Sequence, residues 1–123
     1  MATPSEHWKD EPESQDFPAA QTYLSLLMKP SQASRLADAL QKETRLDTYL
    51  AKDILRASRL ALLPETNAHV AGDLAKVRAG KKLSPVLLVR GDPLIVADGY
   101  HRVCASYHLD ENAPIPCRIV SPE

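Results

Sequence analysis

The fold is decided by the stretch Leu94-Ile95-Val96-Ala97-Asp98-Gly99-Tyr100-His101-Arg102-Val103-Cys104-Ala105, near the C-terminal end of the sequence. Four apolar residues of strand type run directly into Asp98 and Gly99, and apolar residues at helical spacing follow at once. The pattern predicts a strand that turns sharply into a helix. His101 and Arg102 then lie in the first turn of that helix.

The start of this predicted helix is suited to binding an anion. The first amides of a helix have no intrahelical acceptor and lie at the positive end of the helix dipole. Gly99 lets a ligand approach the main chain, and Arg102 offers a planar guanidinium that can grip phosphate or carboxylate. His101 can donate to the same anion or transfer a proton near neutral pH. Each residue alone also has a structural explanation, such as a helix cap at Asp98, but the cluster favours a site.

Composition limits the classes of protein to consider. The chain has 123 residues, of which 44% are apolar and 25% charged, which is typical of one globular domain. Its formal net charge of −1 gives no general support for a nucleic-acid or membrane-surface protein. No apolar run approaches the roughly 18 residues that cross a bilayer, so we expect a cytoplasmic protein without a membrane contact. Cys104 and Cys117 lack redox or metal-ligand spacing and are expected in the core.

The first 60 residues divide into two predicted parts. Residues 1–16 are acidic and polar apart from Trp8, so we expect a disordered tail, in which that tryptophan is weak evidence for docking. Residues 17–60 are expected to form a helical extension of three amphipathic helices. The second is capped by Ser31 and the third begins near Asp47. These helices are also the candidate surface for a homodimer.

The remaining segment, residues 61–123, mixes helix and strand signals and predicts an α+β fold. A helix capped by Asn67 is closed by Gly80, and the apolar runs 84–89 and 94–97 predict a hairpin. A last strand is expected at 117–120. The basic residues Lys81, Lys82 and Arg90 are either a solvated surface or a candidate nucleic-acid patch.

This order of parts resembles the superfamily of ParB N-terminal domains, sulfiredoxin and archaeal free-serine kinases. The resemblance rests on the strand Ser84-Pro85-Val86-Leu87-Leu88-Val89, the motif Asp98-Gly99-Tyr100-His101-Arg102, and Pro114-Ile115-Pro116 before a closing strand. It covers about half the chain, and the Asp-Gly-x-His-Arg motif is most similar to the kinases. The resemblance implies a small mixed sheet with packed helices.

The resemblance also implies a ligand and several roles. In this superfamily the turn binds nucleotide phosphates, which assigns Gly99, Tyr100, His101 and Arg102 to a nucleotide such as ATP, ADP or CTP. Sulfiredoxin has its reactive cysteine, and the partition proteins an acid, where this chain has Tyr100, so neither of those reactions is expected. The kinases have a catalytic glutamate ahead of the preceding helix. Glu65 is the nearest glutamate here, and His69 is the alternative base.

Two functional hypotheses follow. In the first, the chain is an enzyme of phosphoryl or phosphodiester chemistry, kinase-like or nuclease-like, with Asp98, His101 and Glu65 as catalytic residues and Asp98 holding Mg²⁺. In the second, it is a non-catalytic regulatory module that binds a phosphorylated ligand, a nucleic acid or a protein partner. A purely structural role is the third alternative.

Overall fold

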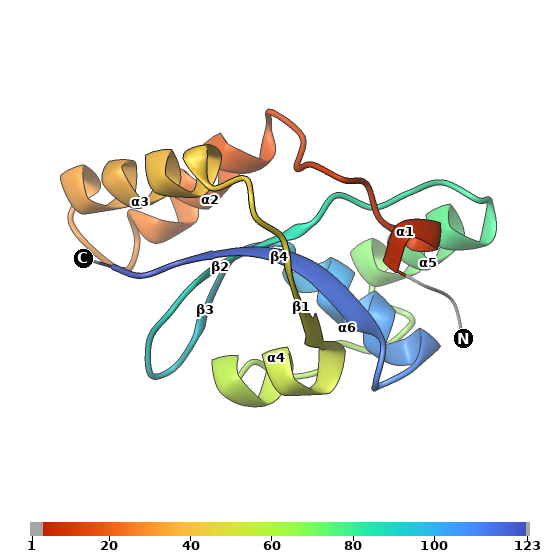
Figure 1. Ribbon diagram of the computed structural model, residues 1–123. Coiled ribbons are helices and arrows are strands. Elements are labelled where there is room, and N and C mark those ends of the chain that lie inside the picture. Colours follow the sequence, from red (N-terminus) through yellow and green to blue (C-terminus); the bar gives the residue numbers. More distant parts are fainter. Residues whose placement is uncertain (1–3, 123) are drawn as a thin grey trace.

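Four short strands form one mixed sheet, with helices on both faces (Figure 1). The computed structural model describes residues 4–122. The strands run in the order β1-β4-β2-β3, and the predicted α+β class is confirmed. The strands are β1 (Asp47–Leu50), β2 (Val86–Val89), β3 (Ile95–Asp98) and β4 (Pro114–Val120). The helices are α1 (Pro4–His7), α2 (Asp16–Leu24), α3 (Pro30–Lys42), α4 (Ala51–Ser58), α5 (Ala68–Arg78) and α6 (Tyr100–Leu109).

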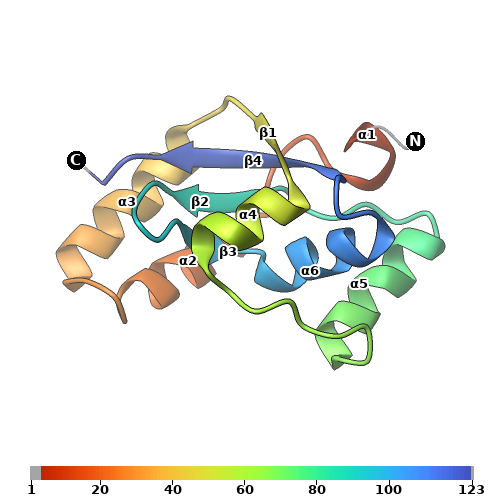
Figure 2. The same ribbon diagram turned by 90° about the horizontal axis from the view of Figure 1, so that it is seen from below.

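The sheet separates two hydrophobic cores because its central strand β2 is apolar on both faces. Leu87 and Val89 face the core under α2 and α3, while Val86 and Leu88 belong to the core under α4, α5 and α6. Figure 2 shows α4 and α6 lying across one face of the sheet. A strand that is buried on both faces has apolar residues at successive positions, and this explains the continuous apolar run at residues 84–89. The exposed apolar residues near the end of α2 are Tyr23, Leu26 and Leu27.

The strand-to-helix junction has the structure that the sequence predicts. β2 and β3 pair antiparallel as a hairpin, and β2 and β4 pair parallel, with β4 starting three residues before the predicted strand. β3 ends at Asp98, Gly99 follows, and α6 begins at Tyr100. α5 is capped by the Asn67 side chain, which accepts from the amides of His69 and Val70.

The predicted third helix is partly wrong, because residues 47–50 form a strand. Asp47 pairs with Cys117 and Leu50 with Pro114 in the β1–β4 ladder, and helix α4 begins only at Ala51. The apolar spacing of this short segment fits a helix, but pairing with β4 along the sheet edge overrides it. The helical extension therefore contributes a strand to the sheet. The Ser31 cap is also wrong, since α3 begins at Pro30 with Lys29 as its N-cap residue.

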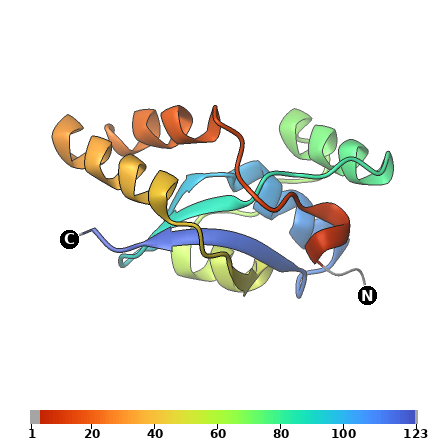
Figure 3. The ribbon, with the colours of Figure 1, turned by 45° about the horizontal axis from the view of Figure 1, so that its top comes forward.

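The described part of the expected tail lies against the body of the protein. Trp8 is only 4% exposed and belongs to the core, and the amide of Lys9 donates to the carbonyl of Leu83 at 2.8 Å. The Leu83 amide donates in turn to the His7 carbonyl at 2.7 Å. Figure 3 follows this segment across the sheet to α2. Burying an aromatic side chain contributes about 1.5–3 kcal/mol, enough to hold a short polar segment. Residues 1–3 of the predicted tail lie outside the described residues.

The structure can be compared with the predictions for the two cysteines and for membrane-spanning segments. Cys104 and Cys117 are free and fully buried, so their predicted place in the core is confirmed. Over the range from residue 4 to residue 122, no helix combines the length and the apolar character that crossing a bilayer requires.

Candidate functional site

A polar hollow of about 210 Å³ opens where β3 turns into α6. One wall comes from α5, which faces the first turn of α6, and the other comes from the junction itself. We call this hollow the polar pocket, and it is lined by His69, Asp73, Asp98, Gly99, His101 and Arg102. The pocket therefore brings together four of the residues predicted from the motif, the alternative base His69, and one acid that sequence reasoning missed.

Gly99 is required at the mouth of α6. Its φ of +109° lies in a region that side chains other than glycine rarely adopt. A Cβ there would also lie 2.9 Å from Cγ2 of Val86 and 3.0 Å from Nη2 of Arg102. The glycine thus allows the sharp turn and lets the Arg102 guanidinium pack directly over the main chain.

Arg102 forms part of the pocket wall. Its Nη2 donates to Oδ2 of Asp98 at 3.1 Å and to the carbonyl of Pro85 at 3.2 Å, and its side chain is 16% exposed. Its Nε is buried and has no hydrogen-bond partner. Both bonds use Nη2, so Nη1 is the guanidinium nitrogen that remains for a ligand. Arg102 therefore holds the junction together as well as facing the pocket.

The surroundings of the two acids in the polar pocket, Asp98 and Asp73, disfavour their ionised forms. Burial raises the pKa of Asp98, Arg102 opposes the shift, and the neighbouring Asp16 carboxyl raises the pKa further. Burial also raises the pKa of Asp73, again opposed by Arg102. Asp16 is 6% exposed and accepts a hydrogen bond from the Glu13 amide at 2.9 Å. The N-terminal segment thus reaches the site and adds a carboxyl that the sequence did not point to.

Two histidines lie side by side in the pocket. The ring centroids of His69 and His101 are 4.6 Å apart, with the planes tilted by 38°. Burial lowers the pKa of His101, and the neighbouring His69 lowers it further, while Asp73 acts in the opposite direction. His101 is therefore a neutral imidazole at neutral pH, able to accept a proton. His69 and Asp73 are four residues apart on one face of α5, a spacing that would have linked them in the sequence.

Glu65 is not part of the polar pocket, so the structure does not bring it together with Asp98 and His101. Its carboxylate lies 3.6 Å from Nδ1 of His108, and its side chain is 61% exposed. His108 is seven residues after His101 on α6, about 10 Å further along the helix axis at 1.5 Å per residue. The turn that begins at Pro64 directs Glu65 towards the C-terminal end of α6. The alternative base, His69, does line the pocket.

Tyr100 packs into the protein and does not line the pocket. Its hydroxyl donates to the carbonyl of Ala61, and its ring packs against the core under α4, α5 and α6. The side chain therefore anchors the start of α6 to the segment that follows α4. The ring centroid of Tyr100 is 5.6 Å from that of His101, so the Tyr100 side chain lies close to the polar pocket without lining it.

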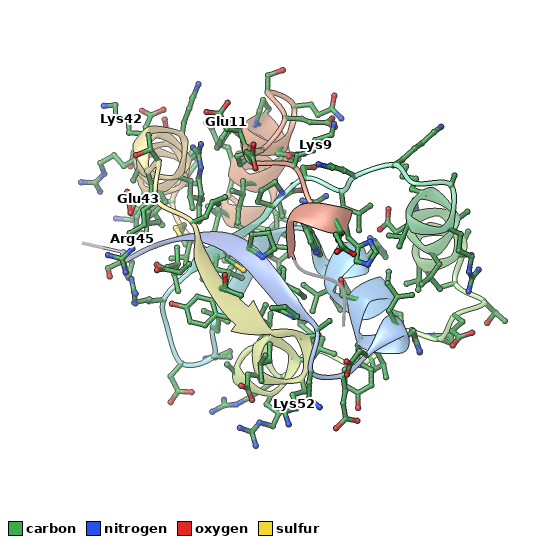
Figure 4. All side chains as sticks on the ribbon, turned by 45° about the vertical axis from the view of Figure 1, so that its right-hand side comes forward. Lys9, Glu11, Lys42, Glu43, Arg45 and Lys52 are labelled. Atoms are coloured by element: carbon green, nitrogen blue, oxygen red, sulfur yellow. The ribbon has the colours of Figure 1, made fainter. Side chains whose placement is uncertain are left out.

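The predicted basic patch is divided between two places. Lys81 and Lys82 lie on the loop between α5 and β2, whereas Arg90 follows the other end of β2 (Figure 2). Eight residues of extended chain span roughly 26 Å, so these cations do not form one surface. Elsewhere, charges of both signs are mixed: Lys42, Glu43 and Arg45 group beside the end of α3 (Figure 4). Neither arrangement resembles the continuous basic stripe typical of nucleic-acid binding.

The pocket has carboxylates for a divalent cation but no complete set of ligands. Among the residues that the structure describes, no group of three or more His, Cys, Asp and Glu side chains is placed to hold a metal ion. Mg²⁺ commonly takes one or two carboxylates and completes its shell with phosphate oxygens and water. Asp73 and Asp98 in one pocket fit that requirement, and Asp98 uses only Oδ2 in its bond to Arg102.

Comparisons with family models, with curated proteins and with solved structures found no match to this chain. The polar pocket and the motif at residues 98–102 are the features of the chain that bear on its function.

Proposed function

We propose that this chain is a ParB-like domain protein that binds the phosphate groups of a nucleotide, together with Mg²⁺, in the polar pocket. The observation that carries the proposal is the convergence of His101, Arg102 and Gly99 with a second histidine and two carboxylates around the start of a ten-residue helix. The free amides of the first helical turn and the helix dipole favour an anion at this position. The order of strand, motif and helix supports the ParB-like assignment.

The charges of the pocket favour a phosphate with its metal over a phosphate alone. Asp98 is paired with Arg102, and His101 is neutral at neutral pH, so Asp73 is not balanced by a further fixed cation in the lining. A bare phosphate would meet this carboxylate as a like charge. A divalent cation held by Asp73 and Asp98 removes the repulsion and, when bound, supplies the positive charge that phosphoryl transfer requires.

The neutral imidazole of His101 gives the pocket the means for catalysis. A general base must accept a proton at the working pH, and the lowered pKa of His101 meets that condition. His101 or His69 would take the proton from an acceptor hydroxyl, or from water, as its oxygen attacks the phosphorus. Arg102 would stabilise the charge that builds up on the phosphate oxygens. A hydroxyl acceptor gives a kinase-like reaction, and water gives hydrolysis of the terminal phosphoanhydride bond; in both, the nucleotide shortened by one phosphate is the leaving group. A phosphodiester in the same position would give a nuclease-like reaction.

The test is isothermal titration with ATP, ADP and CTP, each with and without Mg²⁺. We expect binding that weakens at least 10-fold when Mg²⁺ is removed, and at least 10-fold in His101→Gln and Asp73→Asn, which is a loss of about 1.4 kcal/mol. Asp53→Asn is the matched control, because Asp53 also lies on a helix, far from the polar pocket, in an ion pair with Arg56. Arg102 is unsuitable as a probe since its loss would leave Asp98 unpaired.

The outcomes separate the two hypotheses made from the sequence. Binding followed by loss of the terminal phosphate, with free serine or water as acceptor, supports the enzyme. Binding without turnover supports the regulatory module. No binding of any of the three nucleotides at millimolar concentration would contradict the proposal.

A further inference from the structure

A second hollow, of about 280 Å³, lies at the opposite end of the β2–β3 hairpin from the polar pocket. Its walls are α4, the strands β1, β2 and β4, and the start of β3. We call it the apolar pocket, and its apolar lining consists of Tyr49, Ile54, Ala57, Leu88, Leu94 and Ile119. The volume is near the lower end of the range of roughly 300–1,000 Å³ for small-molecule pockets.

The walls of the apolar pocket are held in place by main-chain hydrogen bonds. Leu88 and Ile119 are register partners in the parallel β2–β4 pair, so their side chains lie next to each other on one face. The amide of Leu94 donates to the carbonyl of Ala57 at 2.9 Å, which ties the hairpin to α4. The hollow therefore lies between elements that are linked to each other, rather than under a loose loop.

The charged residues around this pocket leave one guanidinium in excess. Asp53 lies in the lining of the pocket and is paired with Arg56 at 3.2 Å, and Arg59, outside the lining, pairs with Asp92 at 2.7 Å. Arg90 is exposed at the rim, and its amide donates to Val120 at 2.9 Å, which fixes its backbone. Among residues 6–122, none of the side-chain hydrogen bonds or ion pairs involves the Arg90 guanidinium.

We propose that the apolar pocket binds a small amphipathic carboxylic acid, with its apolar body in the hollow and its carboxylate on Arg90. The apolar lining favours a hydrocarbon or aromatic body by about 25 cal/mol for each Å² removed from water. The unpaired guanidinium supplies the matching charge through a two-pronged hydrogen bond. A nucleotide fits this lining poorly, because the pocket offers few polar groups to a base or sugar. The proposal is independent of the function of the polar pocket.

The test uses octanoate and its neutral analogue 1-octanol, followed by NMR of the methyl groups of Ile54, Leu88 and Ile119. Octanoate is expected to shift these methyls at submillimolar to low-millimolar concentration. Arg90→Gln is expected to weaken octanoate at least 5-fold and to leave octanol within 2-fold. Arg59→Gln is the matched control, since it removes a neighbouring arginine whose partner, Asp92, does not line the pocket, and the affinity of this variant for octanoate should stay within 2-fold. Ala57→Phe, at an exposed rim position, should block both ligands.

Three results would overturn the proposal. The first is the absence of methyl shifts with 5 mM octanoate. The second is equal binding of octanoate by the wild type and by Arg90→Gln, which would remove the role of the carboxylate. The third is sedimentation of the wild type as a dimer that Ala57→Phe converts to a monomer, because a second copy of the chain would then be the occupant.

Discussion

The two pockets lie at the two ends of one hairpin and differ in almost every chemical respect. The polar pocket, at the open end of the hairpin, is lined mainly by ionisable side chains, and three of these, Asp73, Asp98 and His101, have shifted pKa values. The apolar pocket, at the closed end, has a mainly hydrocarbon lining with two charged residues, Asp53, which is paired with Arg56, and Arg90, which has no partner among the described residues. The hairpin contributes to both, so the difference arises from its neighbours. The α5–α6 pair brings charge to one end, and α4 brings apolar surface to the other.

This contrast indicates different kinds of function. Ionisable groups that are buried together, and whose pKa values are shifted by that burial, are typical of sites that perform chemistry. An apolar hollow with one unpaired charge at its rim orients a ligand without activating it.

The largest effect is expected from Trp8→Ala. Removing a large core side chain typically costs about 3–5 kcal/mol, and it should also free the N-terminal segment that carries Asp16 to the polar pocket. We therefore expect a large loss of stability, while octanoate binding to the remaining folded protein is retained. Urea denaturation measures the loss of stability. Tyr23→Ala, at an exposed aromatic residue, is the control and should cost less than about 1 kcal/mol. Equal costs for the two variants would show that Trp8 is not part of the core.

A smaller effect is expected from Gly99→Ala. Backbone strain at a φ of +109° costs about 1–3 kcal/mol, and the new Cβ would press on Val86 and Arg102. Gly72→Ala is the matched control, since Gly72 lies within α5 with nothing within 4 Å of an added Cβ. That change should stabilise the protein by about 0.5–1 kcal/mol. Thermal unfolding of the two variants should shift in opposite directions, and shifts in the same direction would contradict the geometry of the turn.

Asp73 and His101 of the polar pocket should make the stability of the protein depend on pH in opposite ways. The folded pKa of Asp73 is raised, so its contribution to stability is present below the ordinary aspartate pKa and is lost as the pH rises through the raised value. The folded pKa of His101 is lowered, so its contribution is present above the ordinary histidine pKa and is lost as the pH falls through the lowered value.

Thermal unfolding across pH 3–8 measures both effects. The wild type should lose stability relative to Asp73→Asn as the pH rises through the acidic range. It should lose stability relative to His101→Gln as the pH falls below the ordinary histidine pKa. If the stability difference between the wild type and each variant changed with pH in the opposite direction, the Asp73 and His101 side chains would not be buried as the structure shows.

The smallest effect is expected from the double change of Lys81→Gln and Lys82→Gln. These exposed residues contact neither pocket, so the free energy of unfolding should change by less than about 0.5 kcal/mol. Nucleotide affinity should stay within 2-fold. A large loss of affinity in this variant, together with a steep dependence on salt, would revive the nucleic-acid patch predicted from the sequence.

The centre of the fold could be predicted from the sequence because local signals agreed there. The apolar run at 86–89, the Asp98–Gly99 turn and the Asn67 cap each identify an element without knowledge of its neighbours. The strand at 47–50 could not be predicted, because its partner is β4, more than 60 residues away in the sequence. The burial of Trp8 could not be predicted, because the residues around it in the sequence are mainly acidic and polar.

The site was predicted mainly where its residues are close in sequence, and His69, the alternative base, was the one predicted residue of the lining that comes from another element. Asp98, Gly99, His101 and Arg102 come from one turn, so a single motif identifies them. Asp73 and Asp16 reach the same place from α5 and from the N-terminal segment, through packing that no motif encodes. Glu65 lies outside the polar pocket because proximity in sequence to α5 does not give proximity to the start of α6.

The most direct test of the central claim is an NMR titration of the backbone amides with ATP and Mg²⁺. We predict that the largest shifts fall on residues 99–102 and on His69 and Asp73, and that His101→Gln reduces them at equal ligand concentration. The amides around Arg90 and Leu94 serve as the internal reference and should hardly move. Shifts that leave the start of α6 unchanged, or that are strongest around the apolar pocket, would contradict the account.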